Sequence, residues 1–305
     1  MNSINGVVPV LITPLLNNGE IDVVSLENIV QYYNQKNVDA VWCLGTGGED
    51  MCLSFSQRLE VANIVSNTLN KNIKLFLGCS FFSPKESMNF IHETKNLDIF
   101  AYHAMPYHQK VSLTNIEMWY RDINDSIKKL ENGSSLYAYT SGNWAQRIPA
   151  NLIEKLKNEN IITGVKYSSS NILDIYEVLK LTENNFSVIT AVVKTFLACL
   201  KLGVNATTSI EASLFYEDIK CIHEKFVNNF LSEAHENQSF LNNTLLNYPS
   251  EASKDNFLRV SEIKYLLSLK GVCKEYVTPY YRLLTKEEKV KLENYYSNYE
   301  DRIFA

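Results

Sequence analysis

The sequence lacks the features that mark nucleic-acid-binding, membrane-spanning and secreted proteins. Its net charge is -5, its pI is near 5.7, and no run of basic residues resembles a phosphate-binding patch. No apolar stretch reaches the roughly 18 residues that a membrane span needs. The apolar run at 7–12 follows no basic region, which a signal peptide would require. We therefore expect a cytoplasmic protein with neither a nucleic-acid nor a membrane partner.

Cysteines are few and show no pairing pattern. None of the six belongs to a Cys-x-x-Cys pair; they are Cys43, Cys52, Cys79, Cys199, Cys221 and Cys273. Most lie in apolar surroundings, which predicts reduced structural thiols rather than a disulfide framework or a zinc site. His103 and His108 could bind a metal, but no cluster of carboxylates or cysteines accompanies them at metal spacing. We therefore expect no metal.

Glycine is scarce, and its distribution points to one special turn. Only 11 glycines occur, and three of them lie within 45–48, directly after a predicted strand. In Gly45-Thr46-Gly47-Gly48-Glu49, backbone N–H groups could point at one small anion, and Thr46 adds a hydroxyl. A tight turn that needs positive φ is the simpler interpretation. The GxxxxGK[ST] spacing of a P-loop is absent, which argues against a nucleotide-phosphate site.

The 305 residues alternate strand patterns with helical patterns. Predicted strands cover 6–12, 39–44, 74–78, 97–103, 135–139, 161–166, 186–191 and 204–208. A predicted helix follows each strand, and further helices are expected over 238–246, 255–270 and 286–296. Eight βα units favour a closed (β/α)8 TIM barrel of the α/β class over an open doubly wound sheet. We expect the barrel in 1–232 and, in 233–305, C-terminal helices packed on it.

One predicted strand ends on a lysine. The run at 161–165 is largely apolar and leads into Lys166. Catalytic groups of α/β barrels lie at the C-terminal ends of the strands. Partial burial there lowers the pKa of a lysine, and a neutral amine can attack a ketone to form a Schiff base. The alternative is a rim lysine whose stem is buried while its ammonium group reaches water.

Two tyrosines accompany this lysine on the preceding predicted strand. Tyr137 and Tyr139 are two residues apart, so they share one face of a regular strand, and Tyr137 lies one pleat deeper if that face is the barrel interior. A tyrosine beside a neutral lysine can pass protons to and from a carbonyl substrate. Ordinary aromatic packing is the alternative for either tyrosine. Tyr107 and His108 follow another predicted strand, where a packed loop is the default expectation.

Several segments, in this order and spacing, resemble the pyruvate-dependent class I aldolases that include dihydrodipicolinate synthase and N-acetylneuraminate lyase. The segment 6–14 resembles the opening G-x-x-P-x-x-x-T-P, 45–49 resembles G-[TS]-T-G-E, and 53–61 resembles Leu-Ser-x-x-E-R. Tyr137 lies at the tyrosine of Y-N-x-P. The segment 164–166, followed by Ser168 and Ser169, resembles the G-[IV]-K segment that bears the Schiff-base lysine. The C-terminal helices also resemble those of the family.

The resemblance implies a function for each of these positions. Lys166 would form an imine with pyruvate, Tyr137 would shuttle the proton, and Thr46 would join the relay. The implied substrate-binding positions are Gly45, Gly47, Gly48, Tyr107, His108 and Ser209, with the carboxylate held by N–H groups around Gly47 and Gly48. The implied substrates are a 2-oxo acid and an aldehyde, without an organic cofactor. The family usually forms homotetramers, so a homotetramer or homodimer is expected, with 106–110 at the dimer interface.

The departures from the family pattern concern the second substrate most. Gly47 replaces a threonine, and a lost hydrogen bond to a charged group can cost roughly 1.5–3 kcal/mol. Gly142 falls where the synthases have the arginine that binds the carboxylate of their aldehyde. The segment 191–194 lacks the Gly-Tyr-Asp-Glu-like stretch of the lyases. We therefore expect an unfamiliar aldehyde. Apolar or aromatic character would suit Val192, Val193, Trp144 and Tyr139, with Lys194 or Arg147 free to pair with a carboxylate.

Two other functions compete with an aldolase or lyase. A 2-oxo acid dehydratase or hydratase would use the same imine without cleaving a carbon–carbon bond. A barrel could also bind a keto acid without turnover. Two departures from the family favour this last function: Gly47 replaces a threonine, and His108 stands where the synthases have a second tyrosine. Retention of Lys166 and Tyr137 counts against it.

Overall fold

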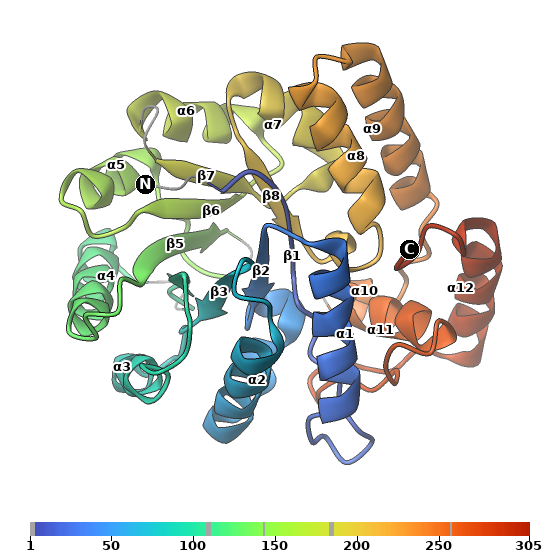
Figure 1. Cartoon of the computed structure of the whole chain (residues 1–305), viewed down its shortest axis with the longest axis horizontal. Helices are drawn as coiled ribbons and strands as arrows, with labels where there is room; N and C mark the ends of the chain where they lie inside the picture. Colours follow the sequence, from blue (N-terminus) through green and yellow to red (C-terminus); the bar gives the residue numbers. More distant parts are fainter. Residues whose placement is uncertain (1–3, 108–110, 143, 183–185, 257) are drawn as a thin grey trace.

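A parallel eight-stranded barrel forms the centre of the protein. The computed structural model describes residues 4–107, 111–142, 144–182, 186–256 and 258–305. The strands are β1 Gly6–Pro9, β2 Ala40–Cys43, β3 Lys74–Gly78, β4 Ala101–Ala104, β5 Ser135–Ser141, β6 Gly164–Ser168, β7 Ser187–Thr190 and β8 Ala206–Ser209. Figure 1 shows them at the centre, enclosed by helices. The predicted TIM barrel of the α/β class is therefore confirmed.

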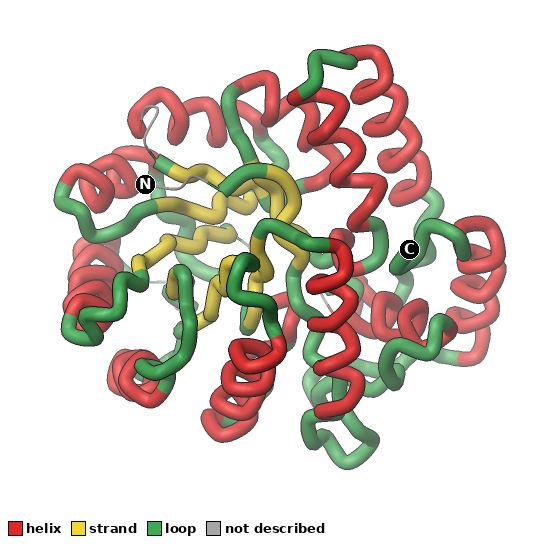
Figure 2. Tube along the Cα trace, in the orientation of Figure 1, coloured by secondary structure: helices red, strands yellow, loops and turns green. Residues whose placement is uncertain are grey.

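Helices follow the strands and form the outer ring. The ring contains α1 Val23–Lys36, α2 Phe55–Thr68, α3 Pro84–Glu93, α4 Leu113–Lys128, α5 Ala150–Asn158, α6 Ile172–Thr182, α7 Phe196–Leu202 and α8 Tyr216–Val227. Further helices are α9 Leu231–Leu246, α10 Ser253–Asn256, α11 Val260–Leu269 and α12 Lys286–Tyr299. Short 3-10 turns are η1 Thr46–Gly48, η2 Asp50–Cys52, η3 Val193–Thr195 and η4 Glu211–Ser213. Figure 2 shows strands inside and helices outside.

The barrel closes between its first two strands. The strands are hydrogen-bonded in the order β1-β8-β7-β6-β5-β4-β3-β2. A parallel bridge pairs Val10 with Trp42, and the N–H of Leu11 donates to the carbonyl of Trp42 over 2.9 Å. This bridge joins β1 to β2, so the C-terminal ends of all eight strands meet at one rim.

Two predicted element boundaries were wrong in ways that matter for the site. The strand expected over 161–166 is instead β6 Gly164–Ser168, so Lys166 lies in the middle of the strand. The helix expected from 255 to 270 is divided into α10 and α11. Side chains cap the first two helices: Asp22 caps α1 by accepting the N–H of Ser25, and Ser54 forms a capping box with Gln57 at α2.

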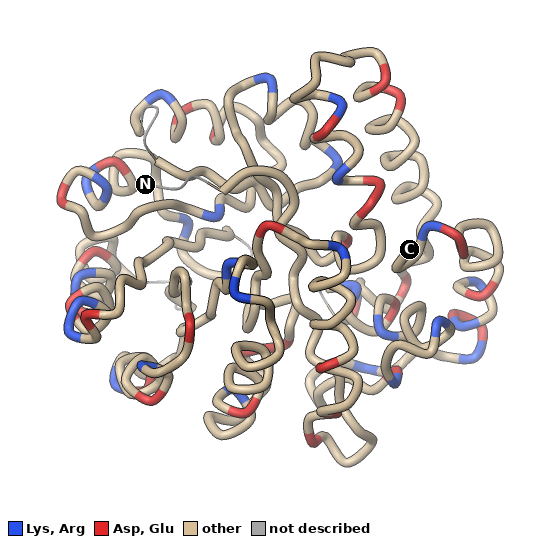
Figure 3. Tube along the Cα trace, viewed as in Figure 1, with Lys and Arg blue, Asp and Glu red and all other residues tan. Residues whose placement is uncertain are grey.

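Two apolar layers explain why the sheet closes. Side chains inside the barrel form one cluster, which includes Trp42, Phe76, Tyr137 and Tyr139, and a larger cluster lies between strands and helices. Charged residues of both signs are mixed along the helices and loops, as Figure 3 shows. No helix among the described residues is long and apolar enough to cross a membrane.

A buried ion pair joins the C-terminal helices to the glycine turn. Glu49, at the end of η1, pairs with Lys264 of α11, and neither side chain is more than 1% exposed. Glu49 also accepts from the N–H and the hydroxyl of Thr278, over 2.7 and 2.8 Å. The Lys264 ammonium donates to the carbonyl of Tyr276 over 2.8 Å. These contacts make α11 part of the wall behind the turn.

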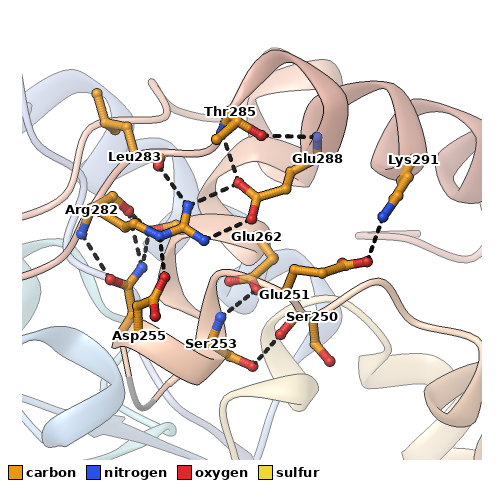
Figure 4. A network of polar contacts seen from close by, with 12 residues as sticks. Ser250, Glu251, Ser253, Asp255, Glu262, Arg282, Leu283, Thr285, Glu288 and Lys291 are labelled. Carbon is orange, nitrogen blue, oxygen red and sulfur yellow. Dashed lines mark hydrogen bonds and ion pairs between the residues drawn. The ribbon is translucent and has the colours of Figure 1, made fainter.

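A second polar network holds the C-terminal helices together (Figure 4). The guanidinium of Arg282 donates to both oxygens of Glu288 and to Asp255. Glu288 in turn forms a capping box with Thr285 at the start of α12. We propose that the barrel spans 1–232 and the additional C-terminal region 233–305, a boundary close to the start of α9 at Leu231.

The buried Glu49–Lys264 pair predicts a measurable stability effect. Lys264→Met should lower the free energy of unfolding by about 3–5 kcal/mol, because it leaves a buried carboxylate without its counter-charge. The double variant with Glu49→Gln should recover part of that loss, since the amide still accepts from Thr278. Urea unfolding measures both.

The exposed pair Lys291–Glu251 provides the control, with side-chain exposures of 55% and 39%. Lys291→Met should lower the free energy of unfolding far less than Lys264→Met does, because water already screens the charges of this exposed pair. A loss for Lys264→Met no larger than that of the control would contradict the importance of the buried pair.

Candidate active site

Lys166 is buried inside the barrel, in the middle of β6. It pairs in register with Tyr139 of β5, and it is 4% exposed. Its Nζ lies 4.3 Å from the centre of the Tyr139 ring and 4.8 Å from that of the Trp42 ring. The rim lysine that reaches water, the alternative allowed by the sequence, is therefore not what the structure shows.

Burial sets the protonation of this amine. It lowers the pKa of Lys166 from an ordinary 10.5 to about 7, because the interior solvates an ammonium group poorly. The negative charges of Asp50 and Glu211 act in the opposite direction and limit the shift. A substantial fraction of Lys166 is therefore a neutral nucleophile near neutral pH.

Tyr139, rather than Tyr137, accompanies the lysine. The Tyr139 hydroxyl and the Thr46 hydroxyl are 3.1 Å apart and share a hydrogen bond. Burial raises the pKa of Tyr139 to about 12, and the hydrogen bond with Thr46 partly offsets that increase. The structure thus brings the predicted Lys166 and Thr46 together through Tyr139, whereas the family resemblance had implied Tyr137 in this role.

Tyr137 lies one pleat deeper, as the spacing predicted, and this depth removes it from the lysine. It pairs in register with Gly164, two residues before Lys166. A Cβ on Gly164 would lie 2.1 Å from the Tyr137 ring, so the ring fills the space that this glycine leaves open. The ring also packs edge-on against Phe76, with centroids 4.9 Å apart. Tyr137 therefore packs in the barrel interior, and its position does not favour proton transfer at Lys166.

The glycine turn has N–H groups that meet no acceptor within the part of the chain that the structure describes. The N–H groups of Gly48, Glu49 and Asp50 donate to carbonyls of Gly45 and Thr46 within the turn. Among the described residues, no hydrogen bond engages the N–H of Thr46 or that of Gly47. A small anion could therefore bind the N–H groups of residues 46 and 47, whereas Gly48, also predicted to contribute, has its donor occupied.

Close approach, rather than positive φ, explains the glycines of the turn. The positive φ values fall on Leu44 and Glu49, at 54° and 59°. A Cβ on Gly48 would lie 2.9 Å from the carbonyl oxygen of Leu11, and one on Gly45 would lie 2.9 Å from Nε1 of Trp42. The tight-turn interpretation had the right location and the wrong residues for the left-handed conformation.

Apolar side chains occupy the space beside Gly47. A Cβ at this position would lie 3.0 Å from Cγ1 of Val10 and 3.3 Å from Cδ1 of Ile210. Both neighbours are carbon atoms, so this wall offers no replacement for a threonine hydroxyl. Anion binding at the turn therefore rests on backbone donors.

The remaining predicted binding residues have other partners. Ser209, at the end of β8, accepts the N–H of Ala212 in η4 over 3.2 Å. Tyr107 donates its hydroxyl to Asp50 over 2.7 Å. His108 lies outside the described residues. The dimer-interface role expected for 106–110 stays a prediction.

Three residues near the lysine were given no role in its chemistry by the sequence analysis, although His103 was considered there as a metal ligand. Asp50 is 1% exposed and follows directly after the glycine turn, where one more acid beside Glu49 gives no distinguishing signal. Trp42 and His103 are buried inside the barrel and stack with ring centroids 3.9 Å apart. Burial lowers the pKa of His103 to about 3, so its imidazole is neutral beside Lys166. An inward-facing polar residue on a predicted strand was the available signal for His103.

The rim beside the lysine is partly apolar. Val193 is 2% exposed, and Trp144 packs partly buried against the barrel interior. Arg147 forms an ion pair with Asp174, which also accepts from Ser169. An anionic substrate would therefore compete with Asp174 for Arg147. Among the described residues, no group of three or more His, Cys, Asp or Glu side chains could hold a metal ion.

Comparison with known proteins places this architecture in a family. The model of the Dihydrodipicolinate synthetase family matches residues 3–298. The 4-hydroxy-tetrahydrodipicolinate synthase of Karelsulcia muelleri (strain GWSS) is 27% identical over 281 residues, which is 91% of each chain.

Solved structures share the fold. Dihydrodipicolinate synthase from Aquifex aeolicus superposes with a TM-score of 0.87 at 20% identity, covering 98% of this chain and 99% of that one. YagE from E. coli K12, a member of the dihydrodipicolinic acid synthase family solved in complex with pyruvate, has a TM-score of 0.87 at 17% identity, covering 97% and 98%. The chain belongs to the dihydrodipicolinate synthetase family, a family of pyruvate-dependent class I aldolases, as a distant member.

Proposed function

We propose that the protein is a Schiff-base-forming class I aldolase or lyase that acts on pyruvate or a related 2-oxo acid. One observation carries this proposal. A buried lysine whose pKa lies near neutrality contacts a tyrosine that is hydrogen-bonded to Thr46. Such a lysine can act as a nucleophile, and the hydroxyl pair can move protons. Binding of pyruvate by the related protein YagE supports the choice of substrate.

The 2-oxo acid would bind by its carboxylate at the two N–H groups of Thr46 and Gly47. Neutral Lys166 would then attack the ketone carbon through Nζ. The Tyr139 hydroxyl, with Thr46 behind it, would protonate the carbonyl oxygen. The same oxygen takes one proton from the attacking amine, and it leaves as water while the iminium forms. A C–H bond beside the iminium carbon then breaks. Its electrons form a neutral enamine, and the proton returns to the Tyr139 phenolate.

The enamine carbon would form a bond to an aldehyde carbon, whose oxygen takes up a proton. Water would then hydrolyse the iminium and restore the Lys166 amine. Read in reverse, the same steps cleave a carbon–carbon bond and release the 2-oxo acid and the aldehyde. Formation and cleavage of the carbon–carbon bond would use the same side chains of the site.

If Tyr139 rather than Tyr137 corresponds to the tyrosine of the family, the residues expected around the second substrate also change. A shift of two residues moves the position of the synthase arginine from Gly142 to Trp144. An indole cannot pair with a carboxylate as an arginine does. We therefore propose an aldehyde with apolar or aromatic character near Trp144 and Val192. A panel of such aldehydes tested against a sugar acid would decide, since activity with the sugar acid alone would contradict the proposal.

One observation favours a second candidate, a barrel that binds a keto acid without turnover. The wall of Val10 and Ile210 beside Gly47 provides no hydroxyl for the substrate carboxylate. A keto acid that binds without an aldehyde-dependent product would identify this function. Release of pyruvate together with an aldehyde would identify a lyase and exclude a dehydratase as the explanation of turnover.

Trapping with borohydride tests the imine directly. Incubation with pyruvate and borohydride should give a stable adduct that peptide mass spectrometry maps to Lys166, and Lys166→Ala should give none. Tyr139→Phe should slow adduct formation by about 10²-fold or more, because proton transfer is lost. Tyr137→Phe is the matched control and should retain the wild-type rate. The reverse order of the two tyrosine variants would contradict the assignment of Tyr139.

The rate of trapping should depend on pH with a midpoint near 7. Below that pH Lys166 is protonated and cannot attack, so the rate rises with pH and levels off once the amine is neutral. Adduct formation measured over a series of buffers gives the midpoint. A rate that continues to climb toward the ordinary lysine pKa of 10.5 would show that Lys166 is not perturbed.

A further inference from the structure

Asp50 is a buried carboxyl group with an incomplete set of partners. It is 1% exposed and lies at the start of η2, directly beyond the glycine turn. One oxygen, Oδ2, accepts the Tyr107 hydroxyl over 2.7 Å. The other, Oδ1, is buried and has no hydrogen-bond partner among the described residues. A buried carboxyl oxygen without a partner costs stability, so its retention needs an explanation.

Arg58 does not supply a hydrogen-bond partner for Oδ1 of Asp50. Arg58 of α2 acts on Asp50 through its charge, yet its guanidinium donates to the carbonyl of Ser80 and stacks on Phe81 at 3.9 Å. Among the described residues, no ion pair joins Arg58 to Asp50. Burial raises the pKa of the Asp50 carboxyl above its ordinary value, and the arginine charge, the Tyr107 hydrogen bond and the Met51 backbone limit that rise.

A chain of contacts connects the buried residues Asp50 and Lys166. Asp50 follows Thr46 by four residues, the hydroxyls of Thr46 and Tyr139 are 3.1 Å apart, and Nζ of Lys166 lies 4.3 Å from the centre of the Tyr139 ring. Each acts on the other through its charge, and Asp50 is the stronger of the two carboxylates that act on the lysine. The weaker is Glu211, which lies 3.9 Å from Arg259 and has a side chain 22% exposed. The other titratable groups that interact with Asp50 or Lys166 are Cys43, Cys52, Arg58, His103, Tyr107, Tyr139 and Tyr281.

Imine chemistry requires a counter-charge at this place. A neutral amine can be buried at modest cost, but its iminium product carries a positive charge that burial penalises. The Asp50 carboxylate, whose charge acts on Lys166 and whose Oδ1 has no hydrogen-bond partner among the described residues, lowers that penalty. Neutral His103 and the aromatic rings of Trp42 and Tyr139 add no negative charge.

We propose that Asp50 is a positioning residue that supplies the counter-charge for the imine nitrogen on Lys166, with Tyr107 holding its carboxylate in place. This inference rests on the proposed Schiff-base function. It assigns a role in the reaction to a residue outside the Lys166, Tyr139 and Thr46 set.

The test measures the pH midpoint of imine formation at Lys166 in the full-length protein. Formaldehyde with cyanoborohydride traps an imine at any accessible amine, and peptide masses report the fraction modified at Lys166. Asp50→Asn keeps an oxygen that can accept from Tyr107 and removes the charge. Because the carboxylate raises the pKa of Lys166, its loss should move the midpoint down by about 1 unit or more. At a pH above both midpoints, trapping with pyruvate should fall about tenfold.

Glu262→Gln is the matched control. Glu262 is also 1% exposed and has an unpartnered oxygen, Oε2, but it is not among the groups that act on Lys166. It should leave the midpoint unchanged, even if the thermal stability falls. Glu211→Gln should shift the midpoint less than Asp50→Asn does. A midpoint in Asp50→Asn equal to that of the wild type would overturn the proposal and leave Asp50 with a purely structural role.

The formaldehyde and pyruvate reactions separate this inference from the function beneath it. Formaldehyde-derived modification of Lys166 without any 2-oxo acid adduct would refute the proposed function, and the midpoint shift would still judge Asp50. If Asp50→Asn does not fold, Tyr107→Phe takes its place. Loss of that hydrogen bond raises the pKa of the Asp50 carboxyl, so the Lys166 midpoint should again move down. An unchanged midpoint in that variant would overturn the proposal.

Discussion

The burial of one amine inside a closed barrel is the constraint on which the candidate site depends. Lys166 is 4% exposed, and its surroundings are the rings of Trp42 and Tyr139. This apolar environment favours the neutral amine over the ammonium. The closure of β1 against β2 completes the barrel that buries these interior side chains and so maintains that environment. The reactivity proposed for the lysine is therefore a property of the barrel as a whole.

The glycine turn connects this chemistry to the rest of the molecule. On one side it presents the N–H groups of Thr46 and Gly47, and on the other Glu49 is held by Lys264 and by Thr278. The C-terminal helices thus reach the turn through a charge pair that is buried on both sides. Since a buried pair is costly to break, the turn is held in one position. Preorganised donors of this kind are what anion binding in a site requires.

Much of the architecture could be predicted because it depends on residues that are close together in the sequence. The alternation of strands and helices, the capping residues Asp22 and Ser54, and the turn at 45–48 all depend on neighbours in sequence. The resemblance to the aldolase family rests on the same kind of signal, and the family match confirms it. The start of β6 was misplaced because the apolar pair Ile161-Ile162 packs before the strand begins, and periodicity does not distinguish the two.

Composition, spacing and motifs in the sequence were enough to give the fold class and the family and to single out Lys166 as the candidate nucleophile. Only the tertiary structure decided which tyrosine lies beside that lysine, because the register of β5 on β6 is set by hydrogen bonds between strands distant in sequence. The tertiary structure also buries Asp50 where its charge acts on Lys166, and it places Val10 and Ile210 in the space beside Gly47. Burial, charge coupling and cavity shape arise from segments that meet only when the barrel closes.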